Sequence, residues 1–311
     1  MQHISSVKKE PLIITLVLIA LSVMPAISEE LAQQTKPRTT GEIISQSSAA
    51  DWRGLDQENS LYIRLKTGLV VVELAPQFAP QHVANTKALV RAGLFDNTSF
   101  YRVIDGFVAQ GGPADSSGLK APENGQLSIP AEFTTTNIDQ MSFTPLNGAD
   151  GYADEVGYVD GFASARNSEK TQAWLTHCYG AFAMGRANAA DSGGTELYVV
   201  IGQAQRYLDR NTTVFGRVIT GMEHLQQLQR SASLNGPVDV SAHNTIVDIK
   251  VGSDLEIQQQ MPIEIMKTNA LAFKDLILAR KNRSEDWFVY AQDYVDVCGV
   301  AVPMRLKKEK E

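Results

Sequence analysis

The pattern of apolar and polar positions changes near residue 60. Residues 29–50 are polar and have no sustained apolar period. This is typical of a flexible segment, so we expect a linker over residues 29–58. From there apolar side chains alternate with polar or aromatic ones in the order Leu61, Tyr62, Ile63, Arg64, Leu65 and Lys66. A Thr67-Gly68 turn and a second β-branched run follow, which predicts a β-hairpin.

Most later segments are predicted as short strands, with two helices between them. Helical spacing over residues 80–92 and again in GMEHLQQLQR, residues 221–230, predicts the helices. The strand signals are two runs around Asp105-Gly106 in FYRVIDGFVAQGG and the segments 180–187, 196–202, 213–219 and 244–252. Many short strands with only two helices favour a β-barrel or a sandwich over a parallel α/β sheet.

Two further regions lie outside this pattern. Residues 113–178 are rich in Gly, Asn, Asp, Ser and Thr and have weak periodicity, so we expect a turn-rich surface insert. Residues 253–311 form an appended α/β tail that we expect to pack on the main domain, residues 59–252. Apolar residues predict a tail helix, and VDVCGVAV predicts a strand after it; the helix signal is Ile265, Met266, Phe273, Leu276 and Ile277.

The N-terminus resembles an export signal. Lys8 and Lys9 precede an uncharged apolar run from Leu12 to Ala26, and small residues follow up to Ser28. The run has about 15 residues, fewer than the roughly 20 that a membrane-spanning helix needs. We therefore expect residues 1–28 to be a signal peptide and the protein to be periplasmic or secreted, with no stable membrane span after cleavage. An uncleaved anchor is the alternative.

Composition narrows the function further. The 311 residues are 43% hydrophobic and 20% charged, and the net charge is −7. This charge argues against a general nucleic-acid binder, which needs a basic face. Cys178 and Cys298 are the two cysteines. In an exported protein they are a candidate disulfide, and two free buried thiols are the alternative. We expect a monomer.

Covalent and metal chemistry find little support. There is no Gly-x-Ser-x-Gly motif and no glycine-rich phosphate loop before a helix. His177 and Cys178 are sequence neighbours, a poor geometry for a base and its nucleophile, and a buried structural pair is the simpler interpretation. The other histidines of the main domain show no metal-ligand spacing, and Asp154 and Asp160 do not fit a calcium loop. We expect no metal and no cofactor, and a site that works by binding.

Rotation about an X–Pro amide is a reaction that binding alone can accelerate. Its barrier arises from lost resonance and is near 18–20 kcal/mol for a peptide bond. Neither proton transfer nor a covalent intermediate is required. A catalyst needs an apolar pocket for the proline ring and a hydrogen-bond donor for the twisting amide. Arg102, among the aromatic and aliphatic residues of FYRVIDGFVAQGG, suits the donor.

That stretch resembles the signature of cyclophilin-type peptidyl-prolyl isomerases. RANAADSGGTELYVVIG and RYLDRNTTVFGRVITGMEHLQQL resemble later segments of the family in the same order. The resemblance covers about Leu61–Gly252, interrupted by the insert, and the insert and tail are similar to those of bacterial exported members. It implies a closed eight-stranded antiparallel barrel capped by two helices, acting on X–Pro bonds of unfolded or extended polypeptides.

The resemblance also implies roles for single residues. Arg102 matches the catalytic arginine, Phe107 the floor of the proline pocket, and Gln110 the residue that orients the arginine and the substrate. The remaining matches line the groove or the pocket: Val108, Ala187, Asn188, Ala189, Glu196, Tyr198, Tyr207, Leu208 and Thr212.

Several of these positions depart from the family pattern. Val108 replaces a common Met, and Tyr207 replaces a common Trp. Glu196 replaces a common Gln and adds a negative charge, and Thr212 replaces a common His and removes a pocket wall. These changes weaken the expectation of cyclosporin binding. They leave open a catalytically weak or inactive peptide-binding module, and a third alternative is an envelope-assembly scaffold that functions through the insert and the tail.

The hairpin itself sets a geometric condition. A two-residue turn at Asp105-Gly106 would pair Ile104 with Phe107 and would put Gln110 on the face opposite Arg102. A shared pocket for Arg102, Phe107 and Gln110 therefore requires a longer turn or a β-bulge. Without such an irregularity, Arg102 could be an edge-strand residue on the outer surface.

Overall fold

The structure is a computed structural model that describes residues 37–113, 118–232 and 242–307. The chain divides into the units Met1–Arg38 and Thr39–Glu311, and the second contains every helix and strand below. The expected signal peptide, residues 1–28, and residues 29–36 of the expected linker lie outside the described residues.

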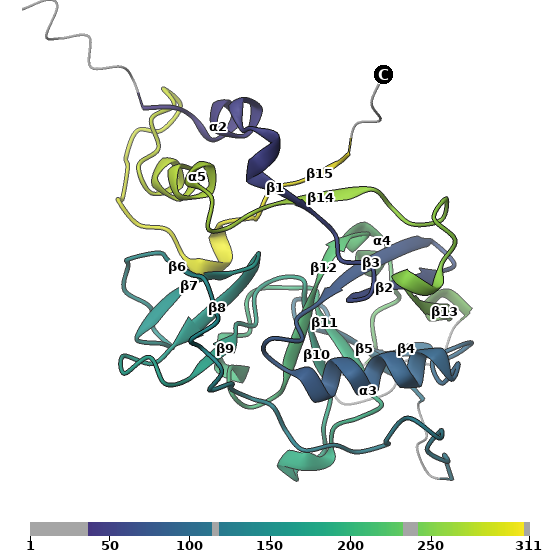
Figure 1. Ribbon diagram of the computed structural model, residues 1–311. Coiled ribbons are helices and arrows are strands. Elements are labelled where there is room, and N and C mark those ends of the chain that lie inside the picture. The colour runs from purple at the N-terminus through teal and green to yellow at the C-terminus, as the bar shows by residue number, and fades with distance from the viewer. Residues whose placement is uncertain (1–36, 114–117, 233–241, 308–311) are drawn as a thin grey trace, which may run out of the picture. The chain divides into compact units, whose positions relative to one another are not determined.

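A nearly closed antiparallel barrel forms the centre of the second unit (Figure 1). Its eight strands lie in the order β13-β2-β3-β12-β10-β11-β5-β4. A bridge between Ser99 and Thr245, and a 2.9 Å hydrogen bond from Ile246 N to Thr98 O, join the two edge strands. The predicted barrel is confirmed, and its strands are β2 (Ser60–Leu65), β3 (Gly68–Leu74), β4 (Ser99–Val103), β5 (Val108–Gly112), β10 (Ala181–Met184), β11 (Leu197–Val200), β12 (Val214–Thr220) and β13 (Ile246–Val251).

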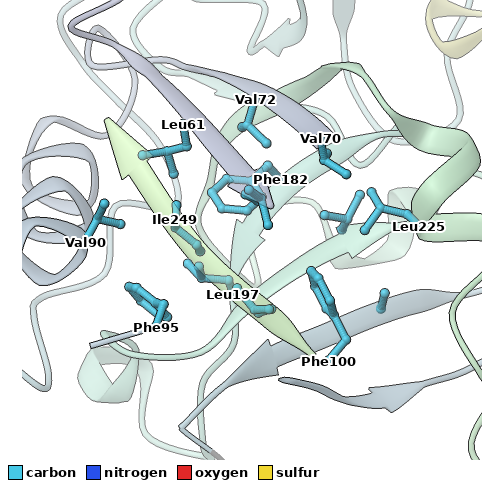
Figure 2. Packing of buried hydrophobic residues seen from close by; sticks show 14 of the residues in the cluster. Leu61, Val70, Val72, Val90, Phe95, Phe100, Phe182, Leu197, Leu225 and Ile249 are labelled. Carbon is cyan, nitrogen blue, oxygen red and sulfur yellow. The ribbon is translucent and has the colours of Figure 1, made fainter. Parts of the chain in front are cut away.

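The inward-facing apolar side chains fill the barrel (Figure 2). Leu61 and Ile63 point into this core, as the alternation in β2 predicts. Tyr62, on the outer face of β2, is also buried, because the tail covers that face. The hydroxyl of Tyr62 donates to Gln57 Oε1 at 3.0 Å and accepts from Met261 N at 2.9 Å.

Two helices cover the barrel, as predicted. α3 (Pro80–Arg91) begins with proline at its first turn, where the missing N–H costs nothing, and packs against β13. α4 (Met222–Gln226) is short and packs against β3. Val90 of α3 and Leu225 of α4 lie on opposite sides of the core in Figure 2.

The insert is more ordered than its composition predicts. Residues 143–175 form a four-stranded antiparallel sheet, in the order β6-β7-β8-β9, where we expected a turn-rich loop. Its apolar side chains pack on both faces: Val156 and Tyr158 join the tail, and Val159 and Phe162 join the outer face of the barrel. Burial on both faces removes the alternation by which strands are recognised. The strands are β6 (Phe143–Pro145), β7 (Glu155–Val159), β8 (Phe162–Arg166) and β9 (Ala173–Leu175).

The expected linker is also ordered from Thr39 onward, so that prediction is wrong for residues 39–58. α2 (Thr40–Gln46) begins with a capping box between Thr39 and Glu42. It is followed by η1 (Ala49–Asp51) and β1 (Trp52–Gly54). Ile43 and Trp52 are buried against the tail. These elements are too short for a periodic pattern, and residues distant in sequence supply their packing.

The tail contributes two strands to a sheet with β1, in the order β1-β14-β15, and forms one helix. β14 (Ile263–Met266) contains Ile265 and Met266, which we had expected in the helix, whereas α5 (Leu271–Lys281) contains the rest of the predicted helix signal. VDVCGVAV is not a strand: it holds the 3₁₀ helix η6 (Val297–Gly299), and β15 (Met304–Leu306) follows it. Apolar runs of this length do not distinguish strand from other buried structure.

A disulfide between Cys178 and Cys298 joins the end of the insert to the tail, with the Cα atoms 5.1 Å apart. The hydroxyl of Tyr158 donates to the carbonyl oxygens of Val297 and Val300 in the same region. The insert, tail and barrel are thus connected by one covalent bond and by shared buried side chains.

Candidate active site

The turn between β4 and β5 places the signature residues. Ile104 N donates to Val108 O at 2.9 Å, so the turn consists of Asp105, Gly106 and Phe107 and is longer than a two-residue turn. Gly106 has φ of 68°, which suits a residue without Cβ. Arg102 therefore lies directly opposite Gln110, on the same face. A register shift between Ser99 and Arg102 adds a bulge in β4.

Strand register extends this face across the barrel. Gln110 of β5 lies opposite Tyr198 of β11, and Tyr198 lies opposite Ala183 of β10. Directly opposite residues share a face of a sheet. Because the alternate residues, such as Phe182 and Leu197, fill the barrel interior, this row lies on the outer face. The structure thus brings Arg102, Gln110 and Tyr198 together on the outside of the barrel.

Arg102 lies over an aromatic ring. Its guanidinium carbon is 5.7 Å from the centre of the Phe107 ring, and its Nη1 donates to Gln110 Oε1 at 3.3 Å. All three side chains are partly exposed. The arrangement presents a fixed donor beside an apolar surface that an incoming group can reach.

Glu196 determines which way the amide of Gln110 points. Gln110 Nε2 donates to Glu196 Oε2 at 2.5 Å and to the Tyr101 hydroxyl at 3.0 Å. The Tyr101 hydroxyl in turn donates to Glu196. Burial, and next the hydrogen bond to Glu196, raise the pKa of Tyr101, so its hydroxyl remains a donor. Because an ionised carboxylate only accepts, the NH₂ group of Gln110 faces Glu196, and its oxygen faces Arg102.

An apolar layer lies below this row. Val108 and Tyr198 belong to a buried cluster on the outer face, and Phe107 packs against it. The insert contributes Phe162 and Leu175 to the same cluster. One side of the layer is therefore built from the insert, which sequence reasoning had placed on the surface.

The hydroxyl of Tyr198 reaches a buried histidine. His177 Nε2 lies 2.9 Å from that hydroxyl and 3.0 Å from Thr212 Oγ1, and His177 Nδ1 lies 2.9 Å from Asp209 Oδ1. Burial raises the pKa of Tyr198, which therefore remains protonated. Cys178 is bound in the disulfide, so His177 and Cys178 do not form a catalytic pair.

The Ala187-Asn188-Ala189 loop is exposed and begins next to the row. Gly185 N donates to Glu196 O at 2.7 Å, which places the start of the loop beside β11. Arg186 holds the loop in place. Its Nη1 donates to the carbonyl oxygens of Ala187 and Asn188, and its Nε donates to Asn211 O at 2.7 Å. Arg186 is not among the site residues predicted from the sequence.

The two remaining residues predicted to line the pocket, Tyr207 and Leu208, come after this loop in the sequence. Tyr207 and Leu208 belong to the 3₁₀ helix η3 (Arg206–Leu208), where Tyr207 is exposed and Leu208 is half-buried. The helix is anchored by Arg206, which bonds Asp209 at 2.7 Å and Asp150 of the insert at 2.8 Å. Within the described ranges, no three His, Cys, Asp or Glu side chains lie close enough together to hold a metal ion.

A barrel of this topology, with an arginine and a glutamine over an aromatic floor on its outer face, defines a peptidyl-prolyl isomerase of the cyclophilin type. Residues 60–251 match the family model "Cyclophilin type peptidyl-prolyl cis-trans isomerase/CLD". The chain therefore belongs to the cyclophilin-type peptidyl-prolyl cis-trans isomerase family.

Curated relatives carry the corresponding names. The chain is 27% identical over 193 residues to a "Probable peptidyl-prolyl cis-trans isomerase" of Brucella suis, which covers 59% of this chain and 78% of the relative. It is 29% identical over 168 residues to "Peptidyl-prolyl cis-trans isomerase B" of Bacillus subtilis, covering 54% of this chain and 88% of that protein.

The fold is also similar to a solved structure, cyclophilin AquaCyp293 from Hirschia baltica. The TM-score is 0.65 at 24% identity, and the match covers 88% of this chain and 99% of that one. The similarity in fold thus extends beyond residues 60–251.

Proposed function

We propose that the protein accelerates cis–trans exchange of X–Pro bonds in exported, unfolded or extended polypeptides, and that Arg102 supplies the donor. The observation that carries this proposal is the placement of Arg102 opposite Gln110 and over Phe107. The proline ring would rest against Phe107 and Val108. The guanidinium would donate to the amide as it twists, when its nitrogen becomes a better acceptor.

The mechanism requires only that the donor is held in place. Gln110 accepts from Arg102, and Glu196 fixes the Gln110 amide, so the guanidinium is oriented before the substrate arrives. Such preorganised donors stabilise the transition state without reorganisation during the reaction. The Ala187-Asn188-Ala189 loop is exposed and is held in place by Arg186, so an extended chain can lie against it.

The test uses residues 29–311 and a proline tetrapeptide in a cis–trans exchange assay. We expect acceleration by the wild type and a loss of about 100-fold in kcat/KM for Arg102→Ala, the scale of removing one transition-state donor. The matched control is Arg64→Ala, since Arg64 is an exposed strand arginine of the same barrel, paired with Asp248. It should retain the wild-type rate. Equal rates for the two variants would contradict the role of Arg102.

A peptide-binding module without catalysis is the second candidate, favoured by Glu196 and Thr212, which depart from the family pattern. It predicts tetrapeptide binding without acceleration. A scaffold acting through the insert and the tail would bind no peptide at this face.

The export of the protein is a further part of the proposal. It is supported by the apolar run Leu12–Ala26 and by the disulfide, a bond that persists in oxidising compartments. In the described part of the chain, no helix is both long and apolar enough to cross a bilayer. N-terminal sequencing of protein from the periplasm should find a chain that begins at residue 29; an intact N-terminus would indicate an anchor.

A further inference from the structure

The imidazole of His177 is hydrogen-bonded on both of its nitrogen atoms. The side chain has no exposed surface. Asp209 Oδ1 lies 2.9 Å from Nδ1 and also accepts from the backbone N of His177 at 2.9 Å. Nε2 faces the hydroxyls of Tyr198 and Thr212. The histidine thus connects a buried carboxylate to two residues of the expected pocket wall.

The carboxylate fixes the direction of these hydrogen bonds. Burial alone would raise the pKa of Asp209, but the hydrogen bond from His177 and the charge of Arg206 outweigh burial and lower it. Asp209 is therefore ionised and only accepts, so Nδ1 carries a hydrogen. In the neutral imidazole Nε2 is then the acceptor. One hydroxyl donates to Nε2 and the other donates to the first hydroxyl, since Tyr198 and Thr212 also contact each other.

The segment that contains Arg206, Asp209 and Thr212 is anchored to the insert by further contacts. Arg206 contacts both oxygens of the Asp150 carboxylate, at 2.8 and 2.9 Å, and bonds Asp209 at 2.7 Å. Asp150 and His177 both belong to the insert, whereas Arg206, Asp209 and Thr212 belong to the segment of the pocket wall. The side chains of Arg206, Asp209 and Asp150 are only 5%, 4% and 3% exposed, respectively.

We propose that His177, a residue of the insert, is a positioning residue for the proline pocket. It acts through Tyr198 and Thr212, whose hydroxyls it holds in one orientation. This inference rests on the proposed function of the pocket. His177 gives the hydroxyl of Thr212 a buried partner, because His177 Nε2 lies 3.0 Å from Thr212 Oγ1.

The variant His177→Asn distinguishes a positioning role of His177 from a merely structural one. The asparagine amide nitrogen can occupy the place of Nδ1 and keep the bond to Asp209, while Tyr198 and Thr212 lose their partner. We expect kcat/KM for the tetrapeptide to fall about tenfold, the scale of a small misplacement in the site, when it is measured well below the unfolding temperature of the variant. That temperature should itself be lower than in the wild type, because two buried hydroxyls lose a partner. His82→Asn is the matched control. His82 is a buried histidine of α3, and its Nδ1 lies 2.7 Å from a carboxylate oxygen of Glu132. This variant should keep the wild-type rate.

Tyr198→Phe keeps the proposal testable if His177→Asn is unstable, and a double-mutant cycle connects the two changes where all the variants fold. Tyr198→Phe removes only the hydroxyl, and we expect about the same loss in rate. If His177 acts through Tyr198, the double variant should be no slower than His177→Asn alone. Wild-type activity in His177→Asn, or fully additive losses, would overturn the proposal.

A further readout does not depend on activity. Nitrogen NMR of the wild type should show a protonated Nδ1 in His177, and an Nδ1 without a hydrogen would also overturn the proposal. A wild type that binds the tetrapeptide without accelerating exchange would contradict the proposed function only. The same variants are then compared by peptide affinity, where His177→Asn should bind about tenfold more weakly and His82→Asn should not.

Discussion

Gln110 donates its side-chain NH₂ group to Glu196 and accepts from Arg102 with its oxygen, so Glu196 determines the orientation of the group that holds the arginine. An amide side chain can turn over and exchange its donor and acceptor ends. An acidic residue at position 196 excludes the turned orientation. The departure from the common Gln at this position is thus compatible with an ordered site.

Replacement of Glu196 tests this orientation. Glu196→Ala removes the acceptor, and we expect kcat/KM in the tetrapeptide assay to fall about 3- to 10-fold, as for the loss of one partly buried hydrogen-bond partner. Glu196→Gln keeps a side-chain oxygen that can accept from Gln110, so we expect it to retain most of the activity. An alanine variant as active as the wild type would show that Gln110 needs no such support.

The signature motif predicted the barrel, which is confirmed, and a shared face for the residues expected at the centre of the site. Arg102, Phe107 and Gln110 lie in one contiguous stretch, and the requirement that they share a pocket predicted an irregular hairpin. The structure meets this requirement with the turn Asp105–Phe107 and a bulge in β4. Local sequence is informative here because turn length alone decides the face on which Gln110 lies.

The supporting residues could not be predicted in the same way. Tyr101 neighbours Arg102 in sequence, and only the bulge in β4 brings it beside Gln110 and Glu196. His177 reaches the pocket wall through Tyr198 and Thr212, which are 21 and 35 positions away in sequence. Such contacts depend on tertiary packing and leave no periodic signal. The available hint was the interpretation of His177 and Cys178 as a buried structural pair.

Trp52 tests the ordered segment that was expected to be a linker. Trp52 is 5% exposed and packs with the tail, and the guanidinium carbon of Arg305 lies 4.0 Å from the centre of its ring. We expect Trp52→Ala to lower the free energy of unfolding by about 3–5 kcal/mol, measured by urea denaturation. Trp287→Ala is the control, since Trp287 is 82% exposed. Similar small effects for both would mean that residues 39–58 contribute little to stability.

Glu58 should make the stability depend on pH in the acidic range. The hydrogen bond from Lys87, followed by that from Ser253, lowers the pKa of Glu58 from 4.5 to about 2. A lowered pKa in the folded state means that the ionised carboxylate stabilises the fold at pH values above 4.5. This contribution is lost as the pH falls from 4.5 towards 2. Because the Glu58 side chain is 48% exposed, solvent screening makes the contribution small.

The comparison of wild type with Glu58→Gln reveals this contribution. The wild type should have the higher unfolding temperature at pH 6, and the difference should shrink as the pH approaches 2. Added salt should reduce it at pH 6 as well. Glu123→Gln, at an exposed position, is the control and should follow the wild type. A difference that is constant with pH would exclude ionisation of Glu58 as its cause.

The disulfide should be a major source of stability. Cys178 and Cys298 are 120 positions apart, and a cross-link over a loop of this length restricts the unfolded chain strongly. The chain-entropy model gives about 4–5 kcal/mol for such a loop. We expect the variant with both cysteines replaced by alanine to lose stability of this order in urea denaturation, and reductant to produce the same loss in the wild type only.

Non-reducing digestion should yield one peptide that joins the two cysteines. Two alkylatable thiols in protein taken from the periplasm, or unfolding curves that reductant does not change, would contradict this prediction.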